Sequence, residues 1–346
     1  MTVQKMTSLE RVRNLKPAPD RLFHSATHEE ILTGATTDIY FVRSYELLRH
    51  MGLGGTPVIA EIFARRDGVF VGIDDVKQLL KDKNIELYSL DEGEEFKRRE
   101  VIMRIEGPYD EFGLYETVIL GFMASPSGWA TAARQCKQAA DGAPIYCFGA
   151  RHLHPAVAPV MERAAIIGGF DGASCILGAK LAGSEPVGTV PHAVILIMGD
   201  TVQVAKIYDK VMPSDAPRIV LVDTFLDEAQ ETLRVAEALG DRLDGVRLDT
   251  PGERGGVTPG LVHEVRQRLD QKGFQHVKVM VSGGLTPERI GELKAAGAAA
   301  FGVGSFVTAA PPIDMTMDLK VVNGVPVAKR GRIPGITNNP KLKRQL

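Results

Sequence analysis

The chain carries Val279-Met280-Val281-Ser282-Gly283-Gly284 and, nearer its end, Ala300-Phe301-Gly302-Val303-Gly304-Ser305. Both stretches begin with β-forming apolar residues and end abruptly in small ones, which predicts two buried strands, each followed by a tight turn. Between them, residues 287–298 place apolar side chains at helical spacing, namely Ile290, Leu293 and Ala296. Together these segments predict a βαβ unit.

The two glycine-rich turns also point to a ligand. Glycines after neighbouring parallel strands let backbone N–H groups approach an anion closely, and the loops after the last two strands of (β/α) barrels are frequent phosphate sites. The alternative is that the glycines serve only to make tight turns. Because two such turns follow consecutive strands, we expect a phosphorylated substrate.

Length and composition bound the class of protein. The 346 residues suffice for about two domains or one elaborated barrel. Lys and Arg number 41 against 43 Asp and Glu, a formal charge of -2, which provides no general attraction to nucleic acid or to a membrane surface. We find no signal-peptide pattern and no bilayer-length apolar run, so we expect a cytoplasmic protein that binds small molecules or copies of itself. The three cysteines form neither a disulfide framework nor a zinc pair; they are Cys136, Cys147 and Cys175.

Strand-like and helix-like segments alternate from Ile145 onward. Further strands are predicted at 145–149, 187–190, 218–223 and 245–249, and helices at 227–239 and 260–269. Regular alternation predicts a parallel α/β sheet, here closed into an irregular barrel over residues 126–305.

The first 125 residues differ, because they contain short β-rich runs instead of this alternation. The runs are 56–63, 69–73, 101–106 and 115–120. Near the end of the chain, Asn323-Gly324 between two apolar runs predicts a hairpin, for which the barrel has no place. We therefore expect a discontinuous α/β sandwich domain, formed by residues 1–125 and completed by 306–346. Residues 91–99 are interpreted as a solvated loop or helix face, and 341–344 as a solvated tail.

Chemically capable side chains fall at the predicted strand ends, where barrel active sites lie. They are Arg151, His192, Asp223, Asp249 and Ser282. His192 is alternatively a hydrogen-bonded core residue, and the two aspartates are alternatively helix N-caps. Phe148 and Arg151 suit a planar anionic ring, the alternative being a surface cation–π contact. His152 and His154 lack a third metal ligand at a convincing spacing.

In their order along the chain, these motifs resemble the nicotinate phosphoribosyltransferase family of type II phosphoribosyltransferases. The resemblance covers most of the chain, through segments 34–40, 148–151, 169–172, 188–192, 247–250, 282–284 and 327–331. It implies an irregular α/β barrel beside an α/β sandwich domain. It also implies transfer of phosphoribose from phosphoribosyl pyrophosphate to a pyridine carboxylate, with Mg²⁺ and with ATP as a co-substrate.

The resemblance implies a role for each residue around the ring. Phe148 stacks on the pyridine, and Tyr40 from a neighbouring subunit covers its other face, which requires a homodimer with shared active sites. Arg151 and Arg247 line the ring and phosphoribosyl pocket, and Asp171 lies near the ring substituent.

The remaining implied roles concern phosphate and catalysis. His192 corresponds to a histidine that relatives phosphorylate from ATP, with Asp223 orienting it. Asp249 holds the ribose hydroxyls or the magnesium pyrophosphate. The 5′-phosphate is held by the two turns, through Gly283, Gly284, Gly302, Gly304 and Ser305, and Ser282 beside them is a further substrate-binding residue.

Some features depart from the pattern or favour another class. Pro191 precedes His192 where some relatives carry an acidic residue. Residues 127–131 resemble the quinolinate enzymes, but those enzymes need several clustered cations for a dicarboxylate, so nicotinate ranks first and quinolinate second. A barrel isomerase or aldolase needs a base or a Schiff-base lysine at a strand end. A non-catalytic phosphate-binding barrel protein is the third hypothesis.

Overall fold

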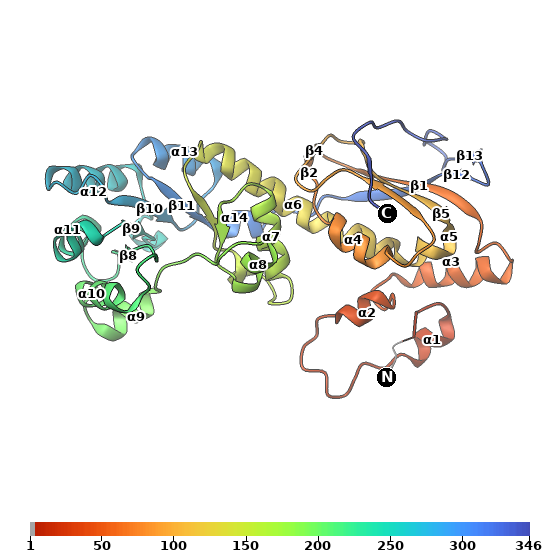
Figure 1. Cartoon of the computed structure of the whole chain (residues 1–346), viewed down its shortest axis with the longest axis horizontal. Helices are drawn as coiled ribbons and strands as arrows, with labels where there is room; N and C mark the ends of the chain where they lie inside the picture. Colours follow the sequence, from red (N-terminus) through yellow and green to blue (C-terminus); the bar gives the residue numbers. More distant parts are fainter. Residues whose placement is uncertain (1–3) are drawn as a thin grey trace. The chain divides into compact units, whose positions relative to one another are not determined.

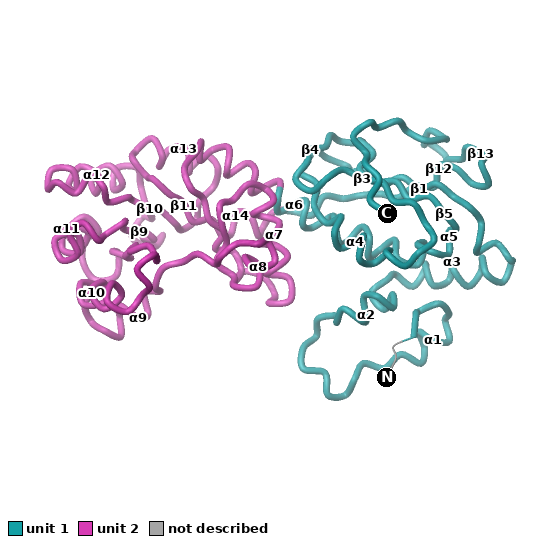
Figure 2. Tube along the Cα trace, in the orientation of Figure 1, with its two compact units in different colours: residues 1–130, 311–346 teal, residues 131–310 magenta. Residues whose placement is uncertain are grey.

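The computed structural model describes residues 4–346. The chain divides into two compact units, one formed by Met1–Ala130 and Pro311–Leu346 and the other by Thr131–Ala310 (Figure 2). The divisions fall at 130/131 and 310/311, compared with the expected 125/126 and 305/306. The first division lies within the long helix α6 (Glu116–Ala140).

The first unit is built on an antiparallel sheet of six strands in the order β13-β12-β1-β5-β3-β14 (Figure 1). Its strands are β1 (Pro57–Ala64), β3 (Glu86–Ser89), β5 (Val101–Pro108), β12 (Met315–Val322), β13 (Val325–Pro326) and β14 (Lys343–Arg344). A separate pair consists of β2 (Gly68–Val69) and β4 (Glu95–Phe96). Strand β4 lies within the predicted solvated stretch 91–99, which is therefore partly wrong: Phe96 is buried in the core.

Helices of the first unit pack against this core, the first two of them only through partly buried side chains. They are α1 (Leu9–Asn14), α2 (His28–Leu32), α3 (Ile39–His50), α4 (Ile73–Leu80) and α5 (Tyr109–Phe112), followed by the 3-10 turn Gly113–Tyr115 and the start of α6. The prediction of a strand-like run at 115–120 is wrong. Tyr115, Val118 and Ile119 are all buried, and their i, i+3, i+4 spacing is that of a helix face.

The end of the chain completes this sheet. The predicted hairpin is present, with Val322 paired to Val325 and with positive φ at Asn323 (50°) and Gly324 (76°), as a two-residue hairpin turn requires. Strand β12 pairs antiparallel with β1. Residues 341–344 are largely exposed, as predicted, but they do not form a free tail, because Lys343 and Arg344 form β14 against β3. Their side chains pair with Asp91 and Glu86.

The second unit contains six parallel strands in the order β7-β6-β11-β10-β9-β8. They are β6 (Ile145–Cys147), β7 (Gly172–Ala173), β8 (Ile219–Leu221), β9 (Gly245–Leu248), β10 (Lys278–Ser282) and β11 (Ala300–Val303). The last strand, β11, pairs with the first, β6, so the sheet brings the two ends of the strand sequence together, as a barrel does. The expected α/β barrel is thus confirmed.

The barrel is irregular on one side. Within the described residues, no strand pairing joins β7 to β8, and the predicted strand at 187–190 is wrong. That stretch instead runs as an extended segment beside β7, with a single bond from Val187 N to Ala173 O (2.9 Å). Glycine and proline on either side of Thr189-Val190 explain why no ladder continues.

Helices alternate with the strands of this unit. They are α7 (Ala158–Ile167), α8 (Ile176–Leu181), α9 (His192–Met198), α10 (Thr201–Val211), α11 (Glu228–Leu239), α12 (Pro259–Gln271), α13 (Pro287–Ala295) and α14 (Ser305–Thr308), with 3-10 turns at Ala150–His152, Gly240–Arg242 and Gly252–Arg254. Asp227 caps α11, while Thr258 and Thr286 cap α12 and α13 ahead of a first-turn proline, a favourable pairing of residues. None of the helices in residues 4–346 combines the length and hydrophobicity needed to cross a bilayer.

Candidate active site at the carboxyl ends of the barrel strands

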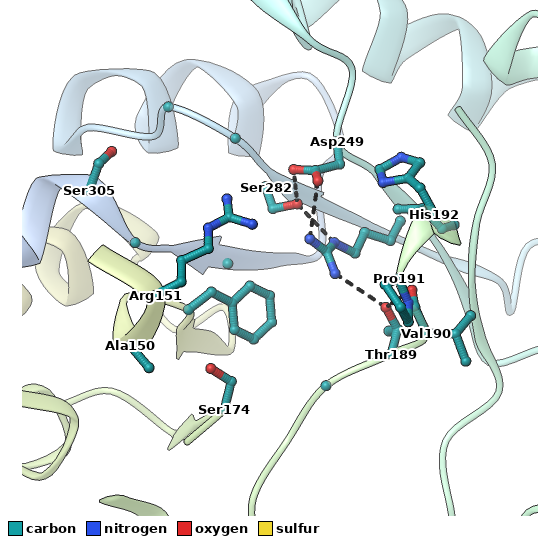
Figure 3. A pocket seen from close by; sticks show the side chains of 18 of the residues that line it. Ala150, Arg151, Ser174, Thr189, Val190, Pro191, His192, Asp249, Ser282 and Ser305 are labelled. Atoms are coloured by element: carbon teal, nitrogen blue, oxygen red, sulfur yellow. Dashed lines mark hydrogen bonds and ion pairs between the residues drawn. The ribbon is translucent and has the colours of Figure 1, made fainter. Parts of the chain in front are cut away.

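A cavity of about 470 Å³ opens where the six barrel strands end (Figure 3). Its lining comes from residues that lie at or just past strand ends and from the extended segment before α9. They are Phe148, Ala150, Arg151, His152, Ser174, Gly188, Thr189, Val190, Pro191, His192, Leu221, Arg247, Asp249, Ser282, Gly283, Gly284, Gly302, Gly304 and Ser305. The structure thus brings together most of the residues singled out in the sequence.

Both glycine turns border the cavity, and each requires glycine for a physical reason. Gly283 (φ 92°) and Gly284 (φ 59°) adopt left-handed backbone conformations, which side chains other than glycine rarely tolerate. Gly302 is needed for space, because a Cβ there would lie 2.4 Å from Cε2 of Phe148. A Cβ at Gly304 would lie 2.9 Å from the carbonyl oxygen of Phe148.

Arg247 connects the strand ends through its guanidinium group. Its Nε donates to Ser282 Oγ (2.8 Å), one terminal nitrogen to Thr189 Oγ1 (3.2 Å) and the other to Asp249 Oδ2 (3.3 Å). Ser282 Oγ in turn donates to Asp249 Oδ1 (2.7 Å). This closed set of bonds holds Asp249 at the cavity wall in one orientation (Figure 3).

Phe148 and Arg151 present an aromatic face and a cation to the same cavity. The guanidinium carbon of Arg247 lies 5.1 Å from the centre of the Phe148 ring, a cation–π distance. Arg151 is exposed, and its Nε donates to His152 Nε2 (3.4 Å). Among the described residues, no carboxylate lies within ion-pair distance of Arg151, so its charge faces the cavity unpaired.

His192 begins α9 and contacts the buried carboxylate of Asp223. His192 Nε2 lies 3.1 Å from Asp223 Oδ1, with the histidine side chain 38% exposed and the aspartate 1% exposed. Burial raises the pKa of Asp223, and the neighbouring His192 opposes that rise. Neither Asp223 nor Asp249 caps the α-helix that follows it, since Asp227 caps α11 and Thr258 caps α12.

Two predicted site residues lie elsewhere. Asp171 precedes β7, and its carboxylate accepts from Lys137 Nζ (2.7 Å) and from the backbone N–H of Ile145 (2.8 Å) at the amino end of β6. The placement expected for Asp171, beside the ring, is therefore not what the structure shows. Tyr40 belongs to the first unit, where it is 54% exposed.

Tyr40 borders a second cavity, of about 340 Å³, that lies within the first unit and is also lined by Asp38 and Glu116. Burial, reinforced by Asp318, raises the pKa of Glu116 from its usual 4.5 to about 7.

We expect this glutamate to give the unfolding midpoint a distinct pH dependence. A carboxyl group with a raised pKa contributes stability below its unfolded pKa, near 4.5, and loses that contribution as the pH rises through about 7. A Glu116→Gln variant cannot titrate there. The melting temperature of the variant minus that of the wild type should therefore increase from pH 5 to pH 8. Thermal denaturation across this range would measure the difference. The control is Glu264→Gln, on the exposed side of α12, whose melting temperature should change with pH as that of the wild type does. The same pH dependence in Glu116→Gln and the wild type would contradict the expectation.

Among the cavity residues to which the sequence interpretation gave no role are Thr189, Ser174 and Val190. Thr189 and Val190 lie in the segment that is predicted to be a strand. That prediction gave no reason to expect the Thr189 hydroxyl to contact Arg247. Ser174 follows a strand of only two residues, too short to be recognised by periodicity.

The fold and the site define an irregular parallel α/β barrel whose cavity places an aromatic ring and cationic side chains beside two glycine turns. A family model for the quinolinate phosphoribosyl transferase N-terminal domain matches residues 38–127, and the model for the C-terminal domain of the same enzymes matches residues 129–318. The chain belongs to this family.

The individual relatives are named either nicotinate phosphoribosyltransferase or nicotinate-nucleotide pyrophosphorylase. Nicotinate phosphoribosyltransferase pncB1 of Mycobacterium tuberculosis is 30% identical over 248 residues, or 69% of this chain and 54% of that protein. Nicotinate phosphoribosyltransferase of Bacillus subtilis is 33% identical over 214 residues, covering 61% and 43%. This chain therefore spans about half the length of these curated relatives.

Among solved structures, nicotinate-nucleotide pyrophosphorylase from Pyrococcus furiosus shares 44% identity with a TM-score of 0.87, covering 91% of this chain and 82% of that one. Human nicotinic acid phosphoribosyltransferase shares the fold with a TM-score of 0.67 at 18% identity, covering 87% and 77%.

Proposed function

We propose that this protein transfers the phosphoribosyl group of phosphoribosyl pyrophosphate to nicotinate, giving nicotinate mononucleotide and pyrophosphate for NAD biosynthesis. The observation that carries the proposal is the cavity itself, where two glycine turns, the Phe148–Arg151 pair and the Arg247–Asp249 pair meet. Each suits one part of the reactants: the 5′-phosphate, the anionic ring and the ribose with its pyrophosphate.

The chemistry follows from those positions. The ring nitrogen forms a bond to C1 of the ribose, while the bond from C1 to the pyrophosphate oxygen breaks and its electron pair leaves with pyrophosphate. The ribose becomes cationic during the transfer, so preorganised groups that hold the reactants in line lower the barrier most. Phe148 and Arg151 orient the ring, and Asp249, fixed by Arg247 and Ser282, stabilises the developing positive charge.

Mg²⁺ fits this site as a companion of pyrophosphate. Mg²⁺ in phosphoryl sites is typically held by one or two carboxylates together with substrate oxygens. Asp249 reaches the cavity, and Asp223 Oδ2 is buried without a hydrogen-bond partner among the described residues. When bound, the ion would neutralise charge on the departing pyrophosphate; we propose Asp249 as its protein ligand.

The cations around the ring favour a monocarboxylate. The cavity contains two arginines. Arg247 forms an ion pair with Asp249, so Arg151 remains to bind one carboxylate of the base. Strand β7 is followed by Ser174, and Asp223 lies two residues past the end of β8, so neither position supplies a second guanidinium or ammonium group. Quinolinate is the second candidate, because the family models and the name of the Pyrococcus furiosus structure favour it. Among the cavity residues named above, none is a lysine, which argues against a Schiff-base aldolase.

One assay tests the proposal. The protein is incubated with phosphoribosyl pyrophosphate and Mg²⁺ plus nicotinate, nicotinamide or quinolinate, with and without ATP, and nucleotide formation is followed. Nicotinate mononucleotide as the main product is the expected result. Release of carbon dioxide from quinolinate would favour the second candidate. If no nucleotide forms from any base, the third hypothesis, a non-catalytic phosphate-binding barrel protein, is favoured.

Arg151→Ala should raise the KM for nicotinate roughly 10- to 100-fold, the range expected for a lost hydrogen bond to a charged group. The fold should persist, since the Arg151 side chain is exposed. Steady-state kinetics at saturating phosphoribosyl pyrophosphate would measure the change. Arg268→Ala, which removes an exposed arginine of α12 paired with Glu264, is the control. An unchanged KM in Arg151→Ala would remove Arg151 from the base site.

We propose that ATP is coupled to the reaction through His192. Asp223 occupies Nε2 of the imidazole, which leaves Nδ1 as the nitrogen that accepts a phosphoryl group. Wild-type protein incubated with γ-labelled ATP should retain acid-labile phosphate, and His192→Asn should not. Equal labelling of the two proteins would place phosphorylation elsewhere, while no labelling in either would separate the reaction from ATP.

We also propose that the active site is completed by Tyr40 of a second copy in a homodimer. Helix α3 exposes Ile39, Tyr40 and Leu47 by 38%, 54% and 63%, an apolar face that suits an interface. A dimer mass by light scattering is expected. A monomer that is fully active would contradict a shared site.

A further inference from the structure

Glu162 is a fully buried carboxylate that the proposed reaction leaves without a role. It lies in the second turn of α7, a helix whose other buried residues are apolar, including Met161, Ala164 and Ala165, and its own exposed fraction is 0%. Burying a carboxylate costs several kcal/mol unless hydrogen bonds compensate. The position therefore calls for an explanation in its contacts.

Its carboxylate joins the turns that follow two neighbouring strands. Oε1 accepts from the backbone N–H of Ala150 (3.2 Å) and from Ser174 Oγ (3.2 Å), and Oε2 accepts from the backbone N–H of Cys175 (2.6 Å). Ala150 follows β6, and the other two follow β7. Ala150 and Ser174 both line the cavity, so the carboxylate lies directly behind its wall.

The pKa of Glu162 reflects two opposing effects. Burial raises its pKa, while the donors from Cys175, Ser174 and Ala150 oppose that rise. Hydrogen bonds to a charged group are among the stronger ones in proteins, and these act only if both turns stay in place. The carboxylate thus couples the position of one turn to that of the other.

We propose that Glu162 is a positioning residue for the base-binding part of the site: by bonding both turns it fixes Phe148 and Arg151 at the distance from Ser174 that the flat ring requires. This inference rests on the proposed function. It assigns Glu162 no contact with substrate, because Ala150 and Ser174 separate it from the cavity.

The kinetic test compares Glu162→Gln with the wild type. The amide keeps the size but places an NH₂ group against an N–H or O–H donor. The KM for the base is expected to rise roughly 10- to 100-fold, since a displacement near 1 Å costs that much in a positioned site. The KM for phosphoribosyl pyrophosphate should stay within about threefold, because its proposed phosphate site lies in the turns after β10 and β11, whereas Glu162 is bonded to the turns after β6 and β7. Glu162→Asp, with the charge kept but the reach shortened, should fall in between.

A matched control separates positioning from stability. Glu231→Gln removes another fully buried glutamate, which sits on α11 and pairs with Arg234. It should lower the melting temperature without changing the KM for the base. If Glu162→Gln fails to fold, Ser174→Ala removes one of the three donors and should still raise that KM. An unchanged KM for the base in Glu162→Gln, or in Ser174→Ala if Glu162→Gln does not fold, would overturn the proposal.

A measurement without substrate distinguishes this inference from the function itself. Amide hydrogen exchange of peptides spanning 148–153 and 173–178 should accelerate at least tenfold in Glu162→Gln and remain at the wild-type rate in Glu231→Gln. Unchanged exchange overturns the positioning role even if nicotinate is the substrate. Accelerated exchange in a protein that makes no nucleotide would support the bridging of the turns while the proposed function fails.

Discussion

Asp249→Ala is expected to lower kcat/KM roughly a thousandfold, the scale seen when a preorganised charge-stabilising group is removed. Three effects combine. The carboxylate that faces the ribose is lost, Arg247 loses its acidic partner, and Ser282 Oγ loses its acceptor at 2.7 Å. Since the unpaired guanidinium is free to turn toward the departing pyrophosphate, the KM for phosphoribosyl pyrophosphate should change less than kcat.

Single-turnover rates with saturating substrates would measure the loss. Asp244→Ala is a suitable control, because Asp244 accepts from Arg218 N (2.6 Å) just before β9, at the end of the barrel away from the cavity. It should cost stability but leave turnover nearly intact. A variant lacking Asp249 with turnover within tenfold of the wild type would contradict its role.

Gly302→Ala is expected to lower kcat/KM for nicotinate roughly a hundredfold through a single methyl group. The new Cβ would lie 2.4 Å from Cε2 and 2.5 Å from Cδ2 of Phe148, with Ser282 Cβ at 3.2 Å on the other side. Because the backbone of β11 is fixed by pairing with β6 and β10, the ring must move. Its movement also breaks the contact with Arg247.

The matched control is Gly291→Ala within α13, where a Cβ meets nothing within 4 Å. Alanine in a helix interior is favoured over glycine by about 1 kcal/mol, so this variant should be fully active and slightly more stable. Kinetics and melting temperatures of the two alanine variants would be compared. Normal nicotinate affinity in Gly302→Ala would mean that Phe148 does not stack on the base.

Local sequence signals predicted the features that depend on few residues. The glycine turns were recognised because Gly283 and Gly284 need positive φ and because Gly302 and Gly304 need space. The Asn323-Gly324 hairpin is equally local. These requirements leave the same signature whatever the surrounding fold.

Features set by tertiary context were not predictable in this way. The run at 115–120 has apolar residues that suit a strand or a helix, and only packing against the core selects α6. Asp171 lies in a motif of the resembled family, yet it precedes its strand and so sits at the amino edge. Glu162 gave one sequence signal, a lone carboxylate in an apolar helix, but its partners come from two turns that only the folded barrel brings together.

The gap between β7 and β8 has a consequence for how the protein adjusts to its reactants. Everywhere else around the barrel, widening the mouth would require breaking a ladder of strand hydrogen bonds. On this side the wall depends on the bond from Val187 N to Ala173 O and on the Thr189 hydroxyl that meets Arg247. Local opening motions that admit ligands of different size should therefore concentrate along this one side of the barrel, while the side formed by β10 and β11, across from it, stays rigid.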